Sequence, residues 1–532
     1  MLPSLLLPTP VKLKPLIELL SGYEPNIIQF LISGFSNGFP LHYQGEHRIF
    51  QAKNLTSALE NPQIVDMKLA KELAVARLAG PFVSPPFPSF YVSPIGVVPK
   101  KVLGDFRLIH HLSYPKGLSV NDGIPDEHTS VHYATVTDAI RLIKRAGPGC
   151  FLAKTDIKSA FRIIPIHPKD YPLLGMKWRG LYFYDRCMPM GCASSCKTFE
   201  IFSTAVEWIA QHKLKIDKIL HLLDDFLIVS SSSRQCQAYL DIFIDLCDYL
   251  GVPLAPEKTC GPATTLSFAG IELDSIKSEA RLPQEKISKC VETISIFLSR
   301  HKVTLKEIQS LIGLLNFACS VIVPGRAFLR RLIDLTRGIT KAHHFIRLRH
   351  EVKEDLRVWL SFLSSFNGKS FFLNEVWCNS NKLNLFTDAS GSIGFGAIFG
   401  SEWCYGKWPD NWLHRNIAIL EFYPIVLSLC LWGYKMQNHS VLFFTDNESL
   451  VHVINKQSCR DKSLMFFVRK LVLVCLKHNI LFKAKHIPGI KNKLADCLSR
   501  FQVPTFKQLA PAHMNLCPTD IPLHLQPGGC QI

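Results

Sequence analysis

The sequence of 532 residues has no internal repeat, no low-complexity tract and no signal-like N-terminus. Its first ten residues, MLPSLLLPTP, have no basic segment before the short apolar run, and prolines interrupt that run, which argues against a signal peptide or an anchor. The longest apolar stretch, residues 417–434, contains Glu421 and Pro424, and a lone carboxylate inside a bilayer is costly. We therefore expect a soluble protein without a membrane partner.

Acidic residues are scarce relative to basic ones. The chain has 60 Lys and Arg against 43 Asp and Glu, for a net charge of +17, and such an excess favours a protein that binds a polyanion. Hydrophobic residues make up 47% of the chain and charged residues 19%, which excludes a wholly disordered protein. The length predicts two to four domains, at roughly 100–200 residues each.

The cysteines indicate neither a disulfide framework nor a zinc site. Their number is odd, 17, and they are scattered along the chain, which argues against a secreted protein and for a reducing compartment. We therefore expect an intracellular protein, cytoplasmic or nuclear. The closest group, Cys187, Cys192 and Cys196, has no His or second Cys pair to complete a zinc set, so we interpret these residues as small buried apolar side chains.

Five zones of different texture predict an α+β multidomain protein. They are an N-terminal extension (1–90), a zone of short strands alternating with helices (91–278), a helical zone (279–375), a second β-then-α zone (381–500) and a C-terminal tail (501–532). The tail contains prolines and Gly528-Gly529, and we expect a linker or a frayed end there. Residues 281–350 hold 13 Lys or Arg against 4 Asp or Glu, a net charge of +9, which favours a clamp on phosphates over a solvated charged face.

Two adjacent carboxylates, Asp224 and Asp225, lie between apolar runs. Because successive side chains of a strand face opposite ways, such a pair belongs at a tight hairpin turn, where both can approach one site. An isolated Asp-Asp pair is usually a solvated turn, but buried acids repel one another unless a divalent cation is present. Asp156, at the end of an apolar strand, can supply a third carboxylate. Three oxygen ligands favour Mg²⁺, with Mn²⁺ as an alternative, and two ions about 3.5–4 Å apart can activate a 3′-hydroxyl and stabilise a pyrophosphate leaving group.

Four further acids follow: Asp388, Glu421, Asp446 and Asp496. Asp388 and Asp446 each end a strand-like run, whereas Glu421 lies on an apolar helix. Taken singly, each has an ordinary structural explanation, as a cap or as a salt-bridge partner. Together they can form one pocket for two Mg²⁺ ions that activate water against a phosphodiester.

Ordered blocks between residues 93 and 271 make the chain resemble the reverse transcriptases of retroelements, most closely those of DIRS-like and Ngaro-like retrotransposons, which pair this enzyme with a tyrosine recombinase. The blocks are SPIGVVPKK (93–101), DFRLI (105–109), AKTDIKSAF (153–161), MPMG through Phe199 (188–199), LLDDF (222–226), PEKT (256–259) and FAGI (268–271). The resemblance implies a right-hand polymerase, with fingers and palm over 91–278 and a helical thumb and connection over 279–375.

The same resemblance implies roles for individual residues. Asp156, Asp224 and Asp225 would bind metal and carry polymerisation. The residues that would contact the substrate are Lys101 and Arg107 on the triphosphate, Phe161 as the steric gate against a ribose 2′-hydroxyl, Gly191 where template and nucleotide approach closely, and Lys258 near the phosphates. The chain departs from the family at Leu222, where an aromatic residue is usual, and at Met190, where many relatives have Phe. These departures bear on primer geometry or fidelity and touch no metal ligand.

Residues 381–500 resemble the RNase H domain of retroelements, in the order and local motifs of the four acids. This resemblance implies an RNase H-like α/β domain in which Asp388, Glu421, Asp446 and Asp496 bind metal and carry hydrolysis. His486 matches the loop histidine that the family uses near the scissile phosphate, where it can shuttle a proton.

The two resemblances together predict an RNA-directed DNA polymerase with an RNase H that degrades the RNA of the hybrid, serving retrotransposon replication. Its expected partners are RNA and DNA template-primers, RNA–DNA hybrids and deoxynucleoside triphosphates, and we expect the recombinase and capsid proteins to be encoded elsewhere. Two alternatives remain open. One is a decayed or domesticated copy that binds nucleic acid without catalysis, and the other is a cellular nuclease in which only the C-terminal half is active.

Overall fold

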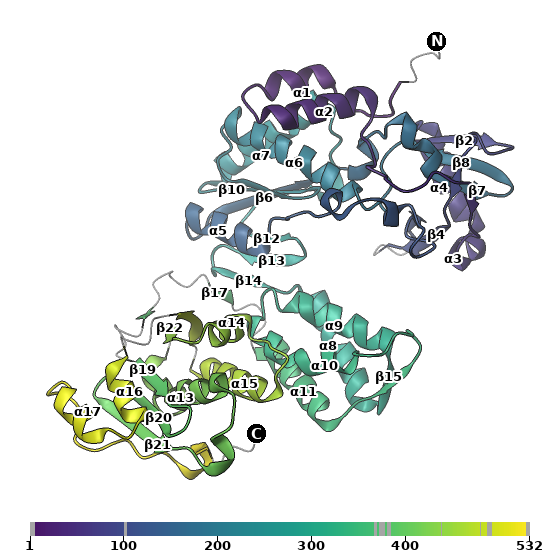
Figure 1. The fold of residues 1–532 in the computed structure, drawn as a ribbon. Helices are drawn as coiled ribbons and strands as arrows, with labels where there is room; N and C mark the ends of the chain where they lie inside the picture. Colours follow the sequence, from purple (N-terminus) through teal and green to yellow (C-terminus); the bar gives the residue numbers. More distant parts are fainter. Residues whose placement is uncertain are drawn as a thin grey trace. The chain divides into compact units, whose positions relative to one another are not determined.

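The computed structural model of the chain describes residues 6–100, 104–365, 370–371, 378–379, 385–437, 439–478, 480–486 and 492–527. The chain divides into two compact units, Met1–Ser278 and Glu279–Ile532 (Figure 1). Helices and strands are mixed in both units, and each unit builds its own core around antiparallel or mixed sheets.

The centre of the first unit is a four-stranded antiparallel sheet. Its strands, in spatial order, are β11 (Cys260–Ala263), β6 (Phe151–Asp156), β10 (Asp225–Ser230) and β9 (Ile219–Leu222). Helices α6 (Ser195–His212) and α7 (Ser233–Leu250) cover one face of this sheet, and α5 (Val136–Ala146) packs on the other (Figure 1). Buried side chains on both faces, such as Leu152 and Phe226, explain why these short strands read as apolar runs.

A second sheet and a ribbon form the other part of this unit. The five strands of the sheet, in spatial order, are β1 (Phe50–Gln51), β3 (Tyr91–Val92), β7 (Gly175–Trp178), β8 (Leu181–Asp185) and β2 (Leu78–Phe82). The ribbon pairs β4 (Ile95–Pro99) with β5 (Phe106–His110), beside α3 (Thr56–Glu60) and α4 (Pro62–Ala74). A further hairpin joins β12 (Thr265–Phe268) to β13 (Ile271–Asp274).

Residues 1–90 are not a separate extension. Helices α1 (Leu13–Leu19) and α2 (Pro25–Asn37) share one hydrophobic core with α6 and β6, and the rings of Phe35 and Phe202 meet at 5.2 Å. Strand β2 completes the five-stranded sheet by pairing with β8. The predicted boundary at residue 90 therefore has no structural counterpart, because long-range packing rather than local composition decides where this domain begins.

The second unit begins with a helical part. It contains the strand pair β14 (Glu279–Arg281) and β17 (Ser370–Phe371), the ribbon β15 (Lys302–Thr304) and β16 (Phe345–Arg347), and the helices α8 (Gln284–Ser299), α9 (Leu305–Ala318), α10 (Arg330–Leu335) and α11 (His350–Ser365). A capping box at Thr304 and Glu307 starts α9, as expected for a helix that follows directly on a strand.

The remainder of the second unit is an α/β domain. Strands β19 (Leu385–Ala389), β20 (Gly394–Phe399) and β21 (Glu402–Lys407) are antiparallel, whereas β18 (Cys378–Asn379), β22 (Ser440–Thr445) and β23 (Leu481–His486) are parallel. The helices are α13 (Ile417–Trp432), α14 (Glu448–Lys456), α15 (Lys462–Lys477), α16 (Lys493–Ser499) and α17 (Val503–Leu509). In the described chain, Ile417–Met436 is the one helical stretch long and apolar enough to cross a membrane, and 72% of it is buried inside the fold.

The prediction that residues 501–532 form a linker or frayed end is wrong for the described part of that segment. Phe506 of α17 is buried against Trp403, with ring centroids 4.8 Å apart. Trp403 Nε1 donates to the carbonyl of Asn515 at 2.8 Å, and Tyr423 Oη donates to the carbonyl of Leu525 at 2.7 Å. A few apolar contacts and hydrogen bonds thus fix this proline-containing segment, although its sequence has no periodic hydrophobic pattern.

Candidate active sites

The three aspartates predicted to bind metal in the first half lie together on β6 and the β9–β10 hairpin. Asp156 ends β6 and is paired directly with Asp225, the first residue of β10, so both side chains share one face of the sheet. Asp224 occupies the two-residue turn between β9 and β10, and its carbonyl accepts from the Ile157 amide at 2.9 Å. We call this group, Asp156, Asp224 and Asp225, the β6–β10 site.

The turn that carries Asp224 is strained. Leu223 has φ +54°, a left-handed conformation that two-residue hairpin turns require and that a branched apolar residue adopts at a cost. Leu222, the position where relatives have an aromatic residue, is paired with Asp225 and is half-buried. The strained residue, Leu223, therefore lies between Leu222, which departs from the family pattern, and Asp224.

The electrostatics of the β6–β10 site are those of crowded carboxylates. Burial, together with the charges of Asp156 and Asp224, raises the pKa of Asp225 to about 6. Burial and Asp156 also raise the pKa of Asp224. Lys258 Nζ contacts Asp156 Oδ2 at 2.7 Å, and although burial alone would lower the pKa of Lys258, this bond raises it. The site holds more negative charge than its neighbours neutralise, a condition that divalent cations relieve.

The structure describes the residues predicted to contact the nucleotide to different extents. Arg107 is exposed on β5, and its positive charge offsets a small part of the rise in the pKa of Asp224. Phe161 lies five residues after Asp156 and packs edge-on against Phe199 at 5.6 Å. Lys258 contacts a carboxylate rather than lying free. Lys101 lies outside the described residues.

Gly191 is required by packing within the chain. A Cβ atom at this position would lie 2.1 Å from the carbonyl oxygen of His110, so no side chain fits there. Asn121 holds the same turn, donating to the Gly191 carbonyl at 2.8 Å and accepting from the Ala193 amide at 2.9 Å. The neighbouring Met190, the second departure from the family pattern, is 48% exposed.

His221, one residue before Leu222, is a polar core residue that the sequence patterns did not single out. Its Nε2 lies 3.2 Å from Glu200 Oε1, and its Nδ1 contacts Glu207 Oε2, both on α6. Burial alone would lower the pKa of His221, but the bonds to these two carboxylates raise it to about 9. The imidazolium therefore ties strand β9 to helix α6. The sequence did contain a signal for this ion pair. It is a His within an apolar strand that follows a helix with two Glu seven residues apart.

The second set of acids surrounds a pocket of the C-terminal α/β domain. Thr387, Asp388, Glu421, Phe444, Thr445, Asp446 and Asn492 line it. Asp388 lies on β19, Glu421 on α13 and Asp446 directly after β22, so an antiparallel sheet, a helix and a parallel sheet bring the three carboxylates to one pocket. We call this group, with Asp496 on α16, the β19–β22 site.

Hydroxyl groups are the main hydrogen-bond donors in the β19–β22 site. Ser499 donates to Asp388, and Thr445 Oγ1 donates to Glu421 Oε2 at 3.2 Å. Burial and then the charge of Asp446 raise the pKa of Glu421 to about 7. Burial also raises the pKa of Asp388, against the hydrogen bond from Ser499. Ser499 was missed, although it stands three residues after Asp496 in the motif.

The other two predicted residues lie at the rim of this pocket. Asp496 is half-exposed and pairs with Arg500, whose Nε lies 2.7 Å from Asp496 Oδ1. His486 ends β23, is exposed, and has Nε2 3.2 Å from the Asp446 carbonyl oxygen. His486 is thus adjacent to the acids. The loop that follows it, residues 487–491, is outside the described residues.

The donor sets of both sites fit Mg²⁺, because they are carboxylates whose pKa values are raised by burial and by one another. Within the described ranges, no three His, Cys, Asp or Glu side chains already converge closely enough to hold an ion. In the β6–β10 site, Lys258 contacts Oδ2 of Asp156, so an ammonium lies beside a carboxylate that would bind the cation.

Helices and sheets are mixed in both units, and the fold is like that of a right-hand polymerase, which confirms the predicted α+β multidomain fold class. A family model described as "Reverse transcriptase (RNA-dependent DNA polymerase)" matches residues 98–273, and these residues form a reverse transcriptase domain of the retroelement or retroviral type. The DIRS-like or Ngaro-like subtype stays a prediction.

Relatives share this domain at low identity. The Pro-Pol polyprotein of feline foamy virus is 26% identical over 202 residues, which are 38% of this chain and 16% of the relative. The Gag-Pro-Pol polyprotein of squirrel monkey retrovirus is 24% identical over 235 residues, 42% of this chain and 11% of the relative. The matches thus span less than a fifth of the length of these curated relatives.

The fold extends beyond the matched domain. A solved structure of the foamy viral protease-reverse transcriptase in complex with RNA/DNA hybrid covers 95% of this chain and 64% of its own, with a TM-score of 0.51 and 14% identity. At this identity the likeness concerns the fold alone, and it includes both units.

Proposed function

We propose that the chain is an RNA-directed DNA polymerase whose C-terminal domain is a ribonuclease H, acting in the replication of a retrotransposon inside the cell, in the cytoplasm or the nucleus. The observation that carries the proposal is the register of Asp156 opposite Asp225 with Asp224 in the adjoining turn, inside a domain of the reverse transcriptase family. The pocket of Asp388, Glu421 and Asp446 supports the second activity.

In the proposed polymerase, Asp156, Asp224 and Asp225 hold two Mg²⁺ ions, with Mn²⁺ as a substitute. When bound, the ions supply activation of the primer 3′-hydroxyl and stabilisation of the pyrophosphate leaving group. Arg107 and Lys101 orient the triphosphate of an incoming deoxynucleotide, Lys258 neutralises charge beside Asp156, and Phe161 excludes a 2′-hydroxyl. These tasks are positioning and charge stabilisation, which dominate phosphoryl transfer.

In the proposed nuclease, Asp388, Glu421, Asp446 and Asp496 form the equivalent set for the RNA strand of a hybrid. His486, beside Asp446, exchanges a proton with solvent near the cleaved phosphate.

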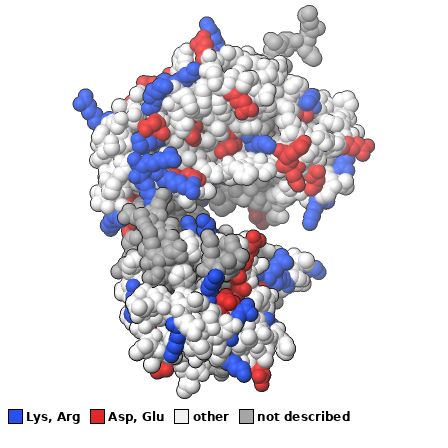
Figure 2. Space-filling view, turned by 60° about the vertical axis from the view of Figure 1, so that its left-hand side comes forward, with Lys and Arg blue, Asp and Glu red and all other residues white. Residues whose placement is uncertain are grey.

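Template-primer binding is supported by charge. Residues 281–350 carry a net charge of +9, and Figure 2 shows Lys and Arg side chains on both units. The foamy viral enzyme is described in complex with an RNA/DNA hybrid, a partner that we propose for this chain as well. We propose that the recombinase and the capsid proteins of the element are encoded elsewhere.

Primer extension on a labelled RNA template, with Mg²⁺ and four deoxynucleotides, tests the function. We expect longer primers and a shortened template on the same gel, both lost with a chelator. Binding without either product would indicate a decayed or domesticated copy. Cleavage without extension, retained in full after deletion of residues 1–375, would indicate a cellular nuclease instead.

A further inference from the structure

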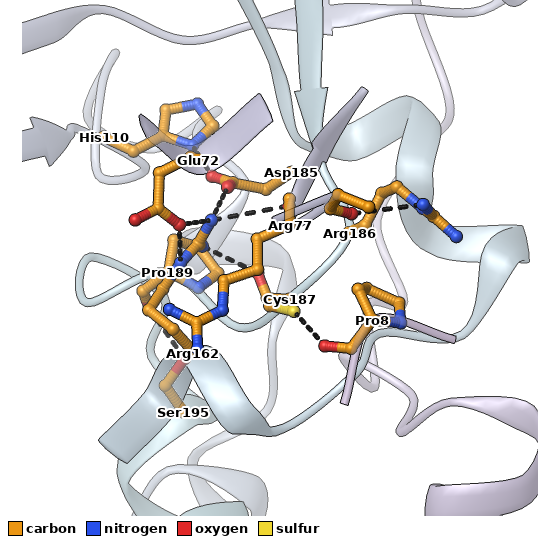
Figure 3. A network of polar contacts seen from close by, with 11 residues as sticks. Pro8, Glu72, Arg77, His110, Arg162, Asp185, Arg186, Cys187, Pro189 and Ser195 are labelled. Atoms are coloured by element: carbon orange, nitrogen blue, oxygen red, sulfur yellow. Dashed lines mark hydrogen bonds and ion pairs between the residues drawn. The ribbon is translucent and has the colours of Figure 1, made fainter. Parts of the chain in front are cut away.

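A buried ionic network joins several elements of the first unit (Figure 3). Its centre is Arg162, which directly follows Phe161 in the short helix η3 (Ala160–Ile163). Arg162 Nε donates to Glu72 Oε2 at 3.0 Å, and Nη2 lies 2.7 Å from Asp185 Oδ1. Nη1 donates to the Cys187 carbonyl at 3.0 Å. Every edge of this guanidinium is therefore occupied by the protein itself.

Asp185 links this arginine to the β4–β5 ribbon. Its second oxygen, Oδ2, lies 3.0 Å from His110 Nδ1, and both side chains are only 5% exposed. His110 Nε2 lies 3.2 Å from the Gly175 carbonyl oxygen, so both ring nitrogens face acceptors. Burial alone would raise the pKa of Asp185, but Arg162 and His110 lower it, so the carboxylate is held in its charged form.

The network reaches three separate parts of the proposed nucleotide pocket. Arg162 is covalently next to Phe161. His110 lies three residues after Arg107 on the same strand, and the His110 carbonyl is the atom against which Gly191 packs. One buried carboxylate, Asp185, therefore fixes Phe161, strand β5 with Arg107, and the turn at Gly191 relative to one another.

These groups do not contact the carboxylates of the β6–β10 site in any recorded bond of the described chain, so their charges are not used in the proposed chemistry. A buried ion pair is weak evidence for stability in itself, because desolvation offsets the attraction. Fixed geometry is what such a pair provides best, and displacing a substrate-contacting group by about 1 Å can cost on the order of a hundredfold in rate.

We propose that Asp185, Arg162 and His110 are positioning residues that set the selection of deoxyribonucleotides over ribonucleotides. They hold Phe161 and the Gly191 turn at the spacing that admits a sugar without a 2′-hydroxyl. The inference rests on the proposed polymerase function and adds to it a set of residues that decide which sugar is accepted.

The test is single-nucleotide incorporation by the full-length chain, with deoxy- and ribonucleotides compared. His110→Ala removes the link from β5 to Asp185, whereas His110→Asn keeps a donor near the position of Nδ1. We expect His110→Ala to raise KM for the deoxynucleotide roughly 10- to 100-fold with kcat within a few-fold, and to reduce sugar discrimination by a similar factor. His110→Asn should restore most of both.

The control is Asp66→Asn, which weakens an ion pair of the same unit whose described bonds do not include Arg162, Asp185 or His110. Asp66 Oδ2 lies 2.6 Å from Arg179 Nη2, and Asp66 Oδ1 accepts from Trp178 Nε1 at 2.7 Å, with the Arg179 and Asp66 side chains 60% and 41% exposed. We expect wild-type KM and discrimination from this variant. Thermal melting checks folding, and if His110→Ala melts before the assay temperature, Glu72→Gln, which loosens Arg162 from its other side, takes its place with the same expectation.

Unchanged discrimination in a folded variant, or an equal loss for both sugars that follows the melting temperature, would overturn the inference and leave the proposed polymerase intact. An inactive wild-type chain would overturn both. The two failures are thus distinguishable from the wild-type lane alone.

Discussion

The β6–β10 site and the β19–β22 site are both groups of acidic side chains, but their described neighbours differ. The β6–β10 site has an ammonium, Lys258, in contact with Asp156, and the charge of Arg107 offsets part of the rise in the pKa of Asp224. The β19–β22 site has hydroxyl donors on Asp388 and Glu421, and Arg500 is paired with Asp496 at the rim. Burial is the main cause that raises the pKa in both sites, to about 6 for Asp225 and about 7 for Glu421.

The difference teaches that the same carboxylate chemistry can be prepared for metal in two ways. An ammonium in contact with a carboxylate lowers the cost of gathering negative charge before an ion arrives. The described carboxylates of the β19–β22 site rely mainly on hydroxyl donors, so we expect this site to take up protons more readily and to depend more strongly on pH.

The strongest way to break the comparison is to remove one carboxylate from each site. We expect Asp156→Asn to lower primer extension by roughly a thousandfold or more and to spare hybrid cleavage, and Asp388→Asn to do the reverse, because each acid serves one pair of ions. Both products are measured on one gel. Equal loss of both activities in a folded variant would show that the two sites do not work separately.

Proton competition should separate the two sites next. A protonated carboxyl cannot bind the ion, so the Mg²⁺ concentration for half-maximal activity should rise as the pH falls below the pKa of the site, up to about tenfold per pH unit. We expect this rise below about pH 7 for cleavage and below about pH 6 for extension. Mg²⁺ titrations between pH 5.5 and 8.5 measure it, and parallel curves for the two activities would contradict the assignment.

His221 should give the first unit a pH-dependent stability. Its pKa is about 9 in the folded protein against about 6.5 in an unfolded chain, so its contribution is complete below pH 6.5 and is lost as the pH rises through 9. We expect His221→Asn to lower the free energy of unfolding by about 3 kcal/mol at pH 6 and by almost nothing at pH 10.

Denaturant unfolding across that range measures the effect of His221. His212→Asn is the control, because His212 is exposed at the end of helix α6, the helix that carries the two glutamate partners of His221. A constant difference between wild type and His221→Asn at all pH values would mean that the imidazole is a packing residue only.

Lys258 offers the finest distinction between the sites. Without its ammonium the pKa of Asp224 should rise further, because the charge of Lys258 lowers that pKa in the wild-type chain. We expect Lys258→Gln to reduce extension about tenfold near pH 7, with cleavage unchanged. Lys218→Gln, which removes a surface lysine paired with Asp217, is the comparison variant. Cleavage falling together with extension would contradict a local role.

Local patterns were sufficient for the carboxylates and insufficient for what surrounds them. Asp156, Asp224, Asp388 and Asp446 follow apolar strands. The structure gathers Asp156 and Asp224 at the end of one sheet, and it gathers Asp388 and Asp446 in a separate pocket where strands of two sheets end. The ion pair of Lys258 with Asp156 joins residues 102 apart, and no periodicity encodes such a distance.

The same limit explains the two misplaced boundaries. Phe35 and Phe506 are ordinary apolar residues in segments rich in proline, and only their contacts with Phe202 and Trp403 make those segments part of a core. Arg162 likewise lies in a segment whose sequence indicates only a turn, and its role depends on Asp185 and Glu72 in other elements. Burial of a charged residue is decided by partners that are distant in the sequence.

Strand β11, which pairs with β6, carries a thiol that can be labelled. Cys260 lies on β11 opposite Lys154 of β6, two residues after Lys258, and it is exposed. Cys517 is also exposed, whereas the other thiols whose burial the structure describes are buried or half-buried. Replacing Cys517, together with Cys378 and Cys530, by Ser would leave Cys260 as the exposed thiol that we expect to react fastest with a maleimide dye. A fluorophore on Cys260 would report the binding of a template-primer near the β6–β10 site, before any nucleotide is incorporated.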